Sequence, residues 1–245
     1  MPVYCITGTN RGIGLEYVRQ LAADPGNTIF ALTRSLNRDN SALESLCNSS
    51  GAQTHILECD TGDVASVESC CQELIGTLKS SDQKIDVLLN NAAVNLKSQL
   101  SSLEIVPDLL MQSFGINVVG PAKMVSCLAA GQVLSPSVRV VNMTSGLASM
   151  QETLDMARIC CMYSISKAAM NMLSLHLAGD LRTKAGLTGA VVILMDPGWT
   201  KTDMGGPGAV LEPAESIAGQ LEVIGGLTDE DNGKFYLYNG KQVRW

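Results

Sequence analysis

Short apolar runs, rich in β-branched residues, recur along the chain at intervals wide enough to hold a helix. They lie at Val3–Thr7, Thr28–Thr33, Thr54–Cys59, Ile85–Asn90, Ser137–Met143, Gly189–Met195 and Lys234–Tyr238. The runs are continuously apolar and do not alternate with polar residues, which is typical of parallel strands covered on both faces. The pattern therefore predicts strands that alternate with helices around a mainly parallel sheet.

The stretches between these runs carry helix signals. We predict helices at Arg11–Ala23, Ser41–Asn48, Asp63–Leu78, Leu109–Val133, Tyr163–Thr183 and Pro213–Ile224. Asp63 and Pro213 stand where an N-cap and a first-turn proline begin a helix, and Pro121 predicts a bend or restart inside the fourth helix. Segments 146–162 and 203–213 are predicted to be irregular loops at the carboxyl edge of the sheet, where open α/β sheets bind ligands.

This alternation predicts an α/β fold, and no Pro/Gly/Ser-rich linker divides the chain. We therefore expect one doubly wound, Rossmann-type domain over residues 1–245, with helices on both faces of the sheet. Apolar residues make up 46% of the chain and charged residues 17%, so there is enough apolar material for a large core.

Charge and residue usage exclude several classes of partner. The formal net charge of −7 disfavours binding to nucleic acid or to an anionic membrane. The sequence shows no secretory leader and no apolar run of membrane-spanning length, so we expect a cytoplasmic protein. Its eight cysteines are scattered without a CxxC pair and are predicted to be reduced thiols, and with two histidines no metal site is expected.

The first candidate site is a glycine-rich turn that directly follows the first strand. Residues 7–14 read TGTNRGIG, with glycines at 8, 12 and 14. Glycine permits a tight turn and a close approach of the backbone to a ligand, and the positive end of the following helix attracts phosphate. Three glycines in a turn are weak evidence alone, but this position after the first strand favours a dinucleotide pyrophosphate site.

The second candidate is a tyrosine and lysine pair. Tyr163 and Lys167 are four residues apart, so one helical turn places both on the same face. A nearby ammonium favours phenolate, which predicts that the pKa of Tyr163 is lowered toward the range useful for acid–base catalysis. The alternative is a surface tyrosine beside a solvated lysine.

The spacing TGxxxGxG, together with YxxxK, resembles the short-chain dehydrogenase/reductase family. Further matching motifs follow in order along almost the whole chain. They are Asp60 after the third strand, Asn90-Asn91-Ala92-Ala93 after the fourth, Asn117, Ser145, Tyr163-Ser164-Ile165-Ser166-Lys167 and Pro197-Gly198-Trp199-Thr200-Lys201-Thr202. The resemblance implies a seven-stranded sheet of order 3-2-1-4-5-6-7, with a cofactor half over about residues 1–145.

The resemblance also implies roles for individual residues. Ser145 would bind the substrate carbonyl, Tyr163 would transfer the proton, Lys167 would also bind the nicotinamide ribose, and Asn117 would hold a water leading to Lys167. For Asn117, a buried amide that satisfies a helix irregularity near Gly115 and Gly120 is an equal alternative. The implied cofactor-binding set is Gly8, Asn10, Arg11, Gly12, Ile13, Gly14, Arg34, Asp60, Asn91, Ala92, Tyr163, Lys167, Pro197, Gly198, Thr200 and Thr202.

The residue after the second strand indicates which cofactor is used. An acidic side chain there accepts from a ribose 2′-hydroxyl, whereas Arg34 suits a 2′-phosphate, and Arg11 adds a second cation. NADP(H) is therefore the predicted cofactor, unless Arg34 and Arg38 are merely solvated. By resemblance, Asp60 would bind the adenine amine.

Two features depart from the family pattern. Ala93 replaces the last glycine of NNAG, and 18 positions separate Ser145 from Tyr163. That long loop, together with residues 196–206 and 233–240, resembles the branch of C-factor and the sniffer-type carbonyl reductases. Met150, Met156, Cys160, Cys161 and Met162 suggest an adaptable apolar pocket wall, although core packing explains them equally.

The preferred hypothesis is an NADPH-dependent reductase of a small-molecule carbonyl or imine. The competing hypothesis is a cofactor-binding signalling or biosynthetic scaffold protein without net redox turnover. Helix 163–183 carries more apolar positions than one buried stripe needs, and the family resemblance implies a twofold contact through helices 109–133 and 163–183. We therefore also predict a homodimer through them, the alternative being that a helix packed in a large α/β domain is apolar nearly all round.

Overall fold

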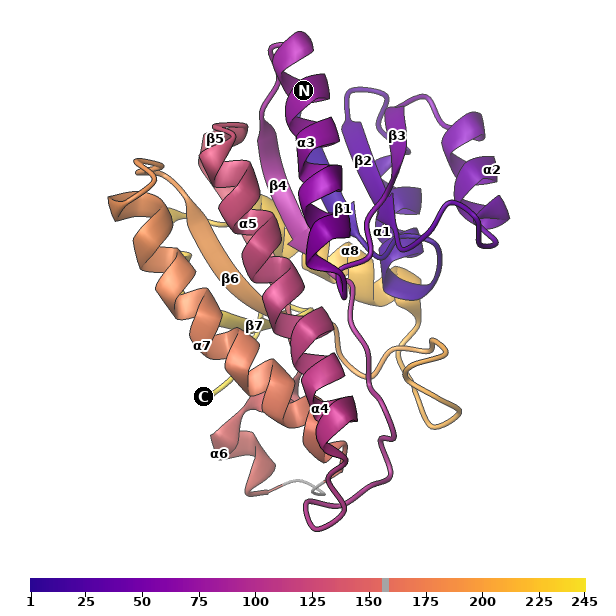
Figure 1. Ribbon diagram of the computed structural model, residues 1–245, viewed down its shortest axis with the longest axis vertical. Helices are drawn as coiled ribbons and strands as arrows, with labels where there is room; N and C mark the ends of the chain where they lie inside the picture. The colour runs from indigo at the N-terminus through magenta and orange to yellow at the C-terminus, as the bar shows by residue number, and fades with distance from the viewer. Residues whose placement is uncertain (156–158) are drawn as a thin grey trace.

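A parallel sheet forms the centre of the protein in the computed structural model, which describes residues 1–155 and 159–245 (Figure 1). Within these residues the sheet has seven strands in the order β3-β2-β1-β4-β5-β6-β7, and each neighbouring pair is parallel. The strands are β1 (Val3–Thr7), β2 (Thr28–Thr33), β3 (Gln53–Glu58), β4 (Ile85–Asn90), β5 (Leu134–Met143), β6 (Val191–Asp196) and β7 (Phe235–Leu237). The predicted fold class and strand order are confirmed.

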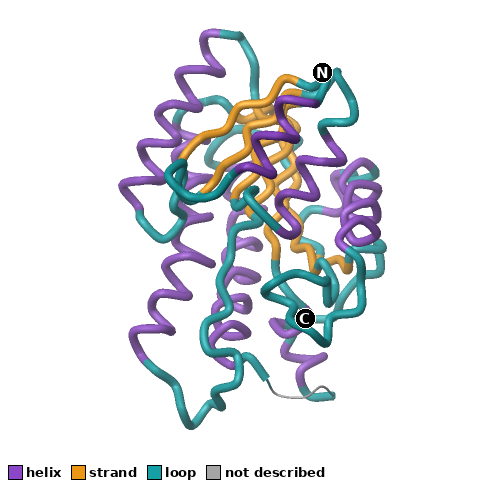
Figure 2. The backbone as a smooth tube through the Cα atoms, turned by 90° about the vertical axis from the view of Figure 1, so that its right-hand side faces the viewer, coloured by secondary structure: helices purple, strands orange, loops and turns teal. Residues whose placement is uncertain are grey.

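Helices cover both faces of this sheet, so that the strands lie between two helical layers (Figure 2). The α-helices are α1 (Gly12–Leu21), α2 (Ser41–Ser49), α3 (Val64–Ser80), α4 (Pro107–Phe114), α5 (Gly120–Ala130), α6 (Met150–Thr153), α7 (Cys161–Thr183) and α8 (Pro213–Gly225). Figure 1 shows α3, α5 and α7 in front of the sheet, with α1 and α8 behind it. Asp63 caps α3 and Pro213 stands in the first turn of α8, as predicted.

Successive strand residues point to opposite faces, which produces two separate apolar cores. Cys5 of β1 packs in the core beneath α3, α5 and α7, whereas its neighbour Ile6 packs in the core beneath α1 and α8. In the second core the Tyr17 hydroxyl of α1 donates to Oε1 of Gln220 in α8 at 2.6 Å, and both side chains are fully buried. This buried bond joins the first and the last α-helix of the chain.

The fourth predicted helix differs from the prediction. It comprises α4, a five-residue π-helical turn η1 (Gly115–Val119), and α5. The irregularity therefore spans Gly115–Val119, near the two glycines as predicted, and the α-helix restarts at Gly120 with Pro121 in its first turn. A proline is tolerated there because its missing N–H falls where the helical hydrogen-bond pattern is resuming.

Two other segments are more ordered than predicted. β5 begins at Leu134, because a register irregularity accommodates Pro136 between the pairings of β4 with Leu134 and with Arg139. The 146–162 segment contains a 3₁₀ turn, η2 (Gly146–Ala148), and the short helix α6, whereas residues 156–158, with Met156, lie outside the described part. The main-chain carbonyl of Trp245 accepts the N–H of Gln151 at 2.7 Å, so the C-terminal segment braces α6.

The continuous helical stretch Pro107–Ala130 is long and apolar enough to pass a membrane-span test, with a mean hydropathy of 1.2 over its best window. A helix was predicted over most of this stretch, but not that its length and apolar composition would pass such a test. Here it lies against α3 and α7 on one face of the sheet (Figure 1), the position of a covering helix in this fold. All eight cysteines fall in the described residues, and each is free, as predicted.

Candidate active site

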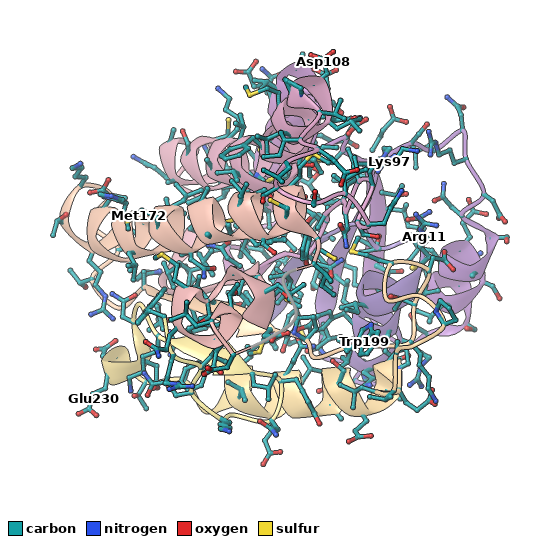
Figure 3. The ribbon with its side chains drawn as sticks, turned by 90° about the horizontal axis from the view of Figure 1, so that it is seen from below. Arg11, Lys97, Asp108, Met172, Trp199 and Glu230 are labelled. Atoms are coloured by element: carbon teal, nitrogen blue, oxygen red, sulfur yellow. The ribbon has the colours of Figure 1, made fainter. Side chains whose placement is uncertain are left out.

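The carboxyl ends of the parallel strands bring the predicted site residues to one edge of the sheet. This edge is seen from below in Figure 3, where Arg11 of the glycine turn and Trp199 of the segment after β6 lie on the same side of the molecule. The two residues are separated by most of the chain, so the sheet topology and not the sequence distance brings them together.

The glycine turn after β1 has the backbone that only glycine adopts easily. Gly8 and Gly12 have φ of +72° and +57°. A Cβ on Gly14 would overlap the carbonyl oxygen of Gly8 and approach the side chain of Asn91 to 2.7 Å. The first turn of α1 therefore lies directly against the loop, with its free N–H groups at the sheet edge. Asn10 and Ile13 belong to the same turn.

The turn is held from β4 by a set of hydrogen bonds. Oγ1 of Thr7 accepts the N–H groups of Asn91 and Ala92 at 3.0 and 2.9 Å, and Nδ2 of Asn91 donates to the Thr7 carbonyl at 2.8 Å. From β6, the methyl group of Thr202 lies 3.4 Å from where a Cβ of Gly12 would be. The predicted residues of three separate motifs thus surround one loop.

The predicted cofactor-selecting cations lie in exposed positions. Arg34 directly follows β2 and its side chain is exposed. Its loop is shaped by Asn40, whose Nδ2 donates to the carbonyls of Ser35 and Arg38 at 3.0 and 3.1 Å. Arg11 is not free, because its Nη1 forms an ion pair with Asp203 at 2.7 Å.

Asp60 begins the turn after β3, next to β2 in the sheet. Its carboxylate accepts the N–H of Gly62 at 2.9 Å, and its own N–H donates to Oγ of Ser66 at the same distance. This contact orders the loop and leaves part of the carboxylate free to accept from a ligand.

Tyr163 and Lys167 lie on α7 with their side chains together. Lys167 is 1% exposed, its Nζ donates to the Met143 carbonyl at 2.7 Å, and it lies 5.7 Å from the centroid of the Tyr163 ring. The ammonium has three protons, so two donors remain after the bond to Met143. Lys167 therefore belongs to the interior of the site and is not a solvated surface lysine.

The expected effect on the tyrosine is wrong in sign. Burial raises the pKa of Tyr163 above its ordinary value, and the charges of Asp196 and Cys160 raise it further. Burial also lowers the pKa of Lys167 to about 7, which weakens its ability to favour phenolate. In this structure the phenol is thus held protonated at neutral pH.

Ser145 and Thr144 at the end of β5 have different environments. The Thr144 hydroxyl donates to Oδ1 of Asn171 in the interior at 2.6 Å, so it is already used. Oγ of Ser145 accepts the N–H of Leu147 at 3.2 Å, and this bond leaves the hydroxyl proton available to a ligand oxygen. Of the two neighbours, Ser145 is the one with a donor to offer.

Asn117 is completely buried in the π-helical turn η1. Its Oδ1 accepts the Val94 N–H at 2.8 Å, and its Nδ2 donates to the Val94 carbonyl and to Oγ of Ser166, both at 2.9 Å. The side chain thus links η1 to the loop after β4 and to the turn of α7 between Tyr163 and Lys167. This geometry matches the buried-amide alternative.

The segment after β6 is fixed by its own hydrogen bonds. Gly198 has φ of +72°, and the Thr200 hydroxyl donates to the carbonyl of Pro197 at 3.0 Å. Asp196, which the sequence interpretation passed over, accepts N–H bonds from Gly146 and Gly198. Only its place directly before the Pro-Gly turn could have drawn attention to it.

A dinucleotide fits these residues. The glycine turn leaves no Cβ between the backbone and a pyrophosphate, α1 presents its N-terminus, and Lys167 keeps two donors for a ribose. The fit rests on backbone geometry and on a buried cation with unused donors, both present in the described residues.

Comparison with known proteins agrees with this geometry. A family model described as short chain dehydrogenase matches residues 2–208. The chain is 37% identical over 162 residues to the C-signal of Myxococcus xanthus, covering 66% of this chain and 93% of that protein. The carbonyl reductase Sniffer of D. melanogaster has a similar structure over 100% of both chains, with a TM-score of 0.87 and 29% identity. An NADPH-bound carbonyl reductase from chicken fatty liver also covers 100% of both chains, with a TM-score of 0.86 and 26% identity.

The chain therefore belongs to the short-chain dehydrogenase/reductase family, as the motifs predicted. It is an oxidoreductase of the NAD(P)-dependent kind that this family comprises.

Proposed function

We propose that the protein reduces a carbonyl or imine group of a small molecule with NADPH, using Tyr163 as the proton donor. The observation that carries the proposal is the buried Tyr163 and Lys167 pair on α7, a helix that packs against the η2 turn capped by Ser145. A reductase needs its acid protonated before the reaction begins. The raised pKa of Tyr163 meets that requirement.

The proposed reaction assigns one task to each group. When bound, the nicotinamide supplies a hydride to the carbonyl carbon. Ser145 donates a hydrogen bond to the oxygen on which negative charge develops, and Tyr163 gives that oxygen its proton. The C=O group becomes CH–OH, and the tyrosinate regains a proton by way of Lys167.

In this proposal, Lys167 binds the ribose and helps to return a proton to the Tyr163 tyrosinate. Because its pKa is near 7, it can both hold and release a proton at neutral pH. The side chain of Asn117 is occupied by Val94 and Ser166, so a water leading to Lys167 would be held by the main chain of η1. Asn117 itself then fixes the turn that holds the water.

Two observations support NADPH, and a third supports an apolar substrate. Arg34 is an exposed cation where a 2′-phosphate would lie, and two of the structural relatives above are carbonyl reductases, one bound to NADPH. Exposed apolar side chains lie on the segments that follow β5 and β6, namely Met150, Leu154, Ile159, Trp199 and Met204. Apolar side chains on these segments favour apolar carbonyl compounds over charged ones.

The test is a panel of apolar ketones, aldehydes and imines, with NADPH oxidation followed by absorbance. Tyr163→Phe should abolish turnover while NADPH binding stays near normal, because only the proton donor is lost. Lys167→Ala should damage both. Nearly full activity of Tyr163→Phe would move the proton-donor role to another group.

The alternative hypothesis, a cofactor-binding signalling protein, is supported by the similarity to a protein named C-signal. It predicts that Tyr163→Phe leaves the biological output intact, whereas a variant that cannot bind the cofactor loses it. The two hypotheses thus differ in the effect of one substitution.

A further inference from the structure

Asp196 ends β6 and its carboxylate lies between the two loops that form the reactive end of the site. Its Oδ2 accepts the N–H of Gly146 at 2.7 Å, and its Oδ1 accepts that of Gly198 at 2.9 Å. Gly146 directly follows Ser145, and Gly198 belongs to the segment after β6 that is expected to bind the cofactor. One side chain therefore joins the proposed oxyanion donor to the cofactor segment.

The contact needs a carboxylate. Both partners are N–H donors, so the side chain between them must accept twice. An asparagine offers one accepting oxygen and would direct its own NH₂ group at the second donor. The fit is also close, because a Cβ on Gly146 would lie only 3.0 Å from Oδ2 of Asp196.

The carboxylate has no cationic partner among residues 1–155 and 159–245, since no lysine, arginine or histidine there forms an ion pair with it. Burial raises the pKa of Asp196, and its two N–H donors oppose that shift by favouring the ionised form. No nearby cation in the described residues therefore neutralises the Asp196 carboxylate, and its negative charge affects the groups close to it.

The neighbouring phenol is Tyr163. Three titratable groups face it, namely Lys167 on α7, Cys160 just before α7, and Asp196 from β6. Asp196 and Cys160 both raise the pKa of Tyr163, and Asp196 has the larger effect. A like charge nearby makes the loss of the phenol proton more costly.

Resting on the proposed function, we propose that Asp196 is a positioning residue that orients Ser145 toward the substrate oxygen by holding the Gly146 and Gly198 loops together. Its negative charge also acts on the Tyr163 phenol, which α7 carries against the η2 turn that follows Ser145. The residue does not contact substrate in this proposal, but acts through Ser145 and Tyr163.

The first test measures the phenol directly and needs no substrate. For each variant, an ultraviolet difference spectrum is taken against the same protein that also carries Tyr163→Phe. The difference isolates the titration of Tyr163 among the five tyrosines of the chain. Asp196→Asn should lower its midpoint by about one pH unit, the scale of a nearby charge. Asp196→Glu keeps the charge and should stay near the wild-type midpoint.

Asp86→Asn is the matched control. That carboxylate accepts the N–H of Val3 at 2.9 Å at the opposite edge of the sheet, far from Tyr163. An unchanged or higher midpoint in Asp196→Asn, or an equal shift in Asp86→Asn, would overturn the electrostatic role. Thermal melts of each variant establish that the proteins compared are folded.

The second test addresses Ser145 through a double-mutant cycle in NADPH-dependent turnover. If Asp196 positions Ser145, then Ser145→Ala should lower kcat by a smaller factor in the Asp196→Asn background than in the wild type. Equal factors would overturn the positioning role. A protein without reductase turnover contradicts the proposed function instead, and the spectroscopic test still decides the role of Asp196.

Discussion

Lys167 shows how one residue can oppose stability and serve function. The structure buries an amine in a site where a single main-chain carbonyl is its partner, and burial lowers its pKa to about 7 from an ordinary 10.5. At acidic to neutral pH the folded protein therefore holds a poorly solvated ammonium, which lowers the free energy of unfolding.

Lys167→Met should raise stability at about pH 6 by roughly 1–3 kcal/mol, the gain being reduced by the lost bond to Met143. The wild type gains stability as pH rises between the folded and unfolded pKa values, because the unfolded state then binds more protons. The difference between the two proteins should therefore shrink by about pH 9. Denaturant unfolding at both pH values measures it, and a difference that grows with pH would contradict the lowered pKa.

A second prediction at this scale concerns Arg34. NADPH should bind at least about tenfold more tightly than NADH, about 1.4 kcal/mol, because an exposed guanidinium lies where the 2′-phosphate is expected. Arg34→Asp should erase or invert that preference, as measured by titration calorimetry with both nucleotides.

Arg38→Asp makes the same charge change on the same loop and serves as the control. If it removes the preference while Arg34→Asp does not, the phosphate is held by Arg38. Equal affinities of the unmodified protein for both nucleotides would contradict NADP(H) selectivity altogether.

Individual elements show where sequence patterns suffice and where they fail. β2 has the predicted bounds because Thr28–Thr33 is apolar, β-branched and buried along its whole length. An irregularity near Gly115 and Gly120 and a restart at Pro121 were predicted, because glycine and proline interrupt helices visibly. The π-helical form of η1 was not predicted, because the contacts of Asn117 come from Val94 and Ser166, which are distant in sequence. Asp196 and the direction of the Tyr163 pKa shift escaped prediction for the same reason.

Removing the Asn117 side chain should destabilise the protein strongly. Asn117→Ala leaves the N–H and carbonyl of Val94 without their partner and removes the bond that the buried Ser166 hydroxyl accepts, at a cost of about 2–4 kcal/mol. Asn27→Ala is the matched control, because that buried amide side chain donates a single bond, to the Leu21 carbonyl. Urea unfolding should show a clearly smaller loss for Asn27→Ala; equal losses would contradict the linking role of Asn117.

At the scale of the whole molecule, one outer face carries more exposed apolar side chains than a covering helix needs. On α7, Met172 is 56% exposed, and on the adjacent α4, Met111 is 68% exposed. Ile165, Leu175 and Val119 are exposed on the same two helical stretches, and Figure 3 places Met172 on α7. This face suits the predicted twofold contact.

We predict a dimer through this face, with a mass of about twice 25.9 kDa by light scattering at micromolar concentration. Met172→Glu should yield a monomer, because two carboxylates would approach each other across a twofold axis. Met204→Glu, on the loop after β6, should leave the mass unchanged. A mass near 25.9 kDa at all concentrations would contradict the dimer.

The buried bond between Tyr17 and Gln220 spans 203 positions of the chain. During translation, α1 leaves the ribosome long before α8 has been made, so the apolar side of α1, with Val18 and Leu21, then lacks the helix that covers it. The nascent chain therefore exposes that surface until α8 has also been made, and such transiently exposed apolar surface favours aggregation. The glycine turn at the start of α1 becomes a finished site only after a helix some two hundred residues further along has docked.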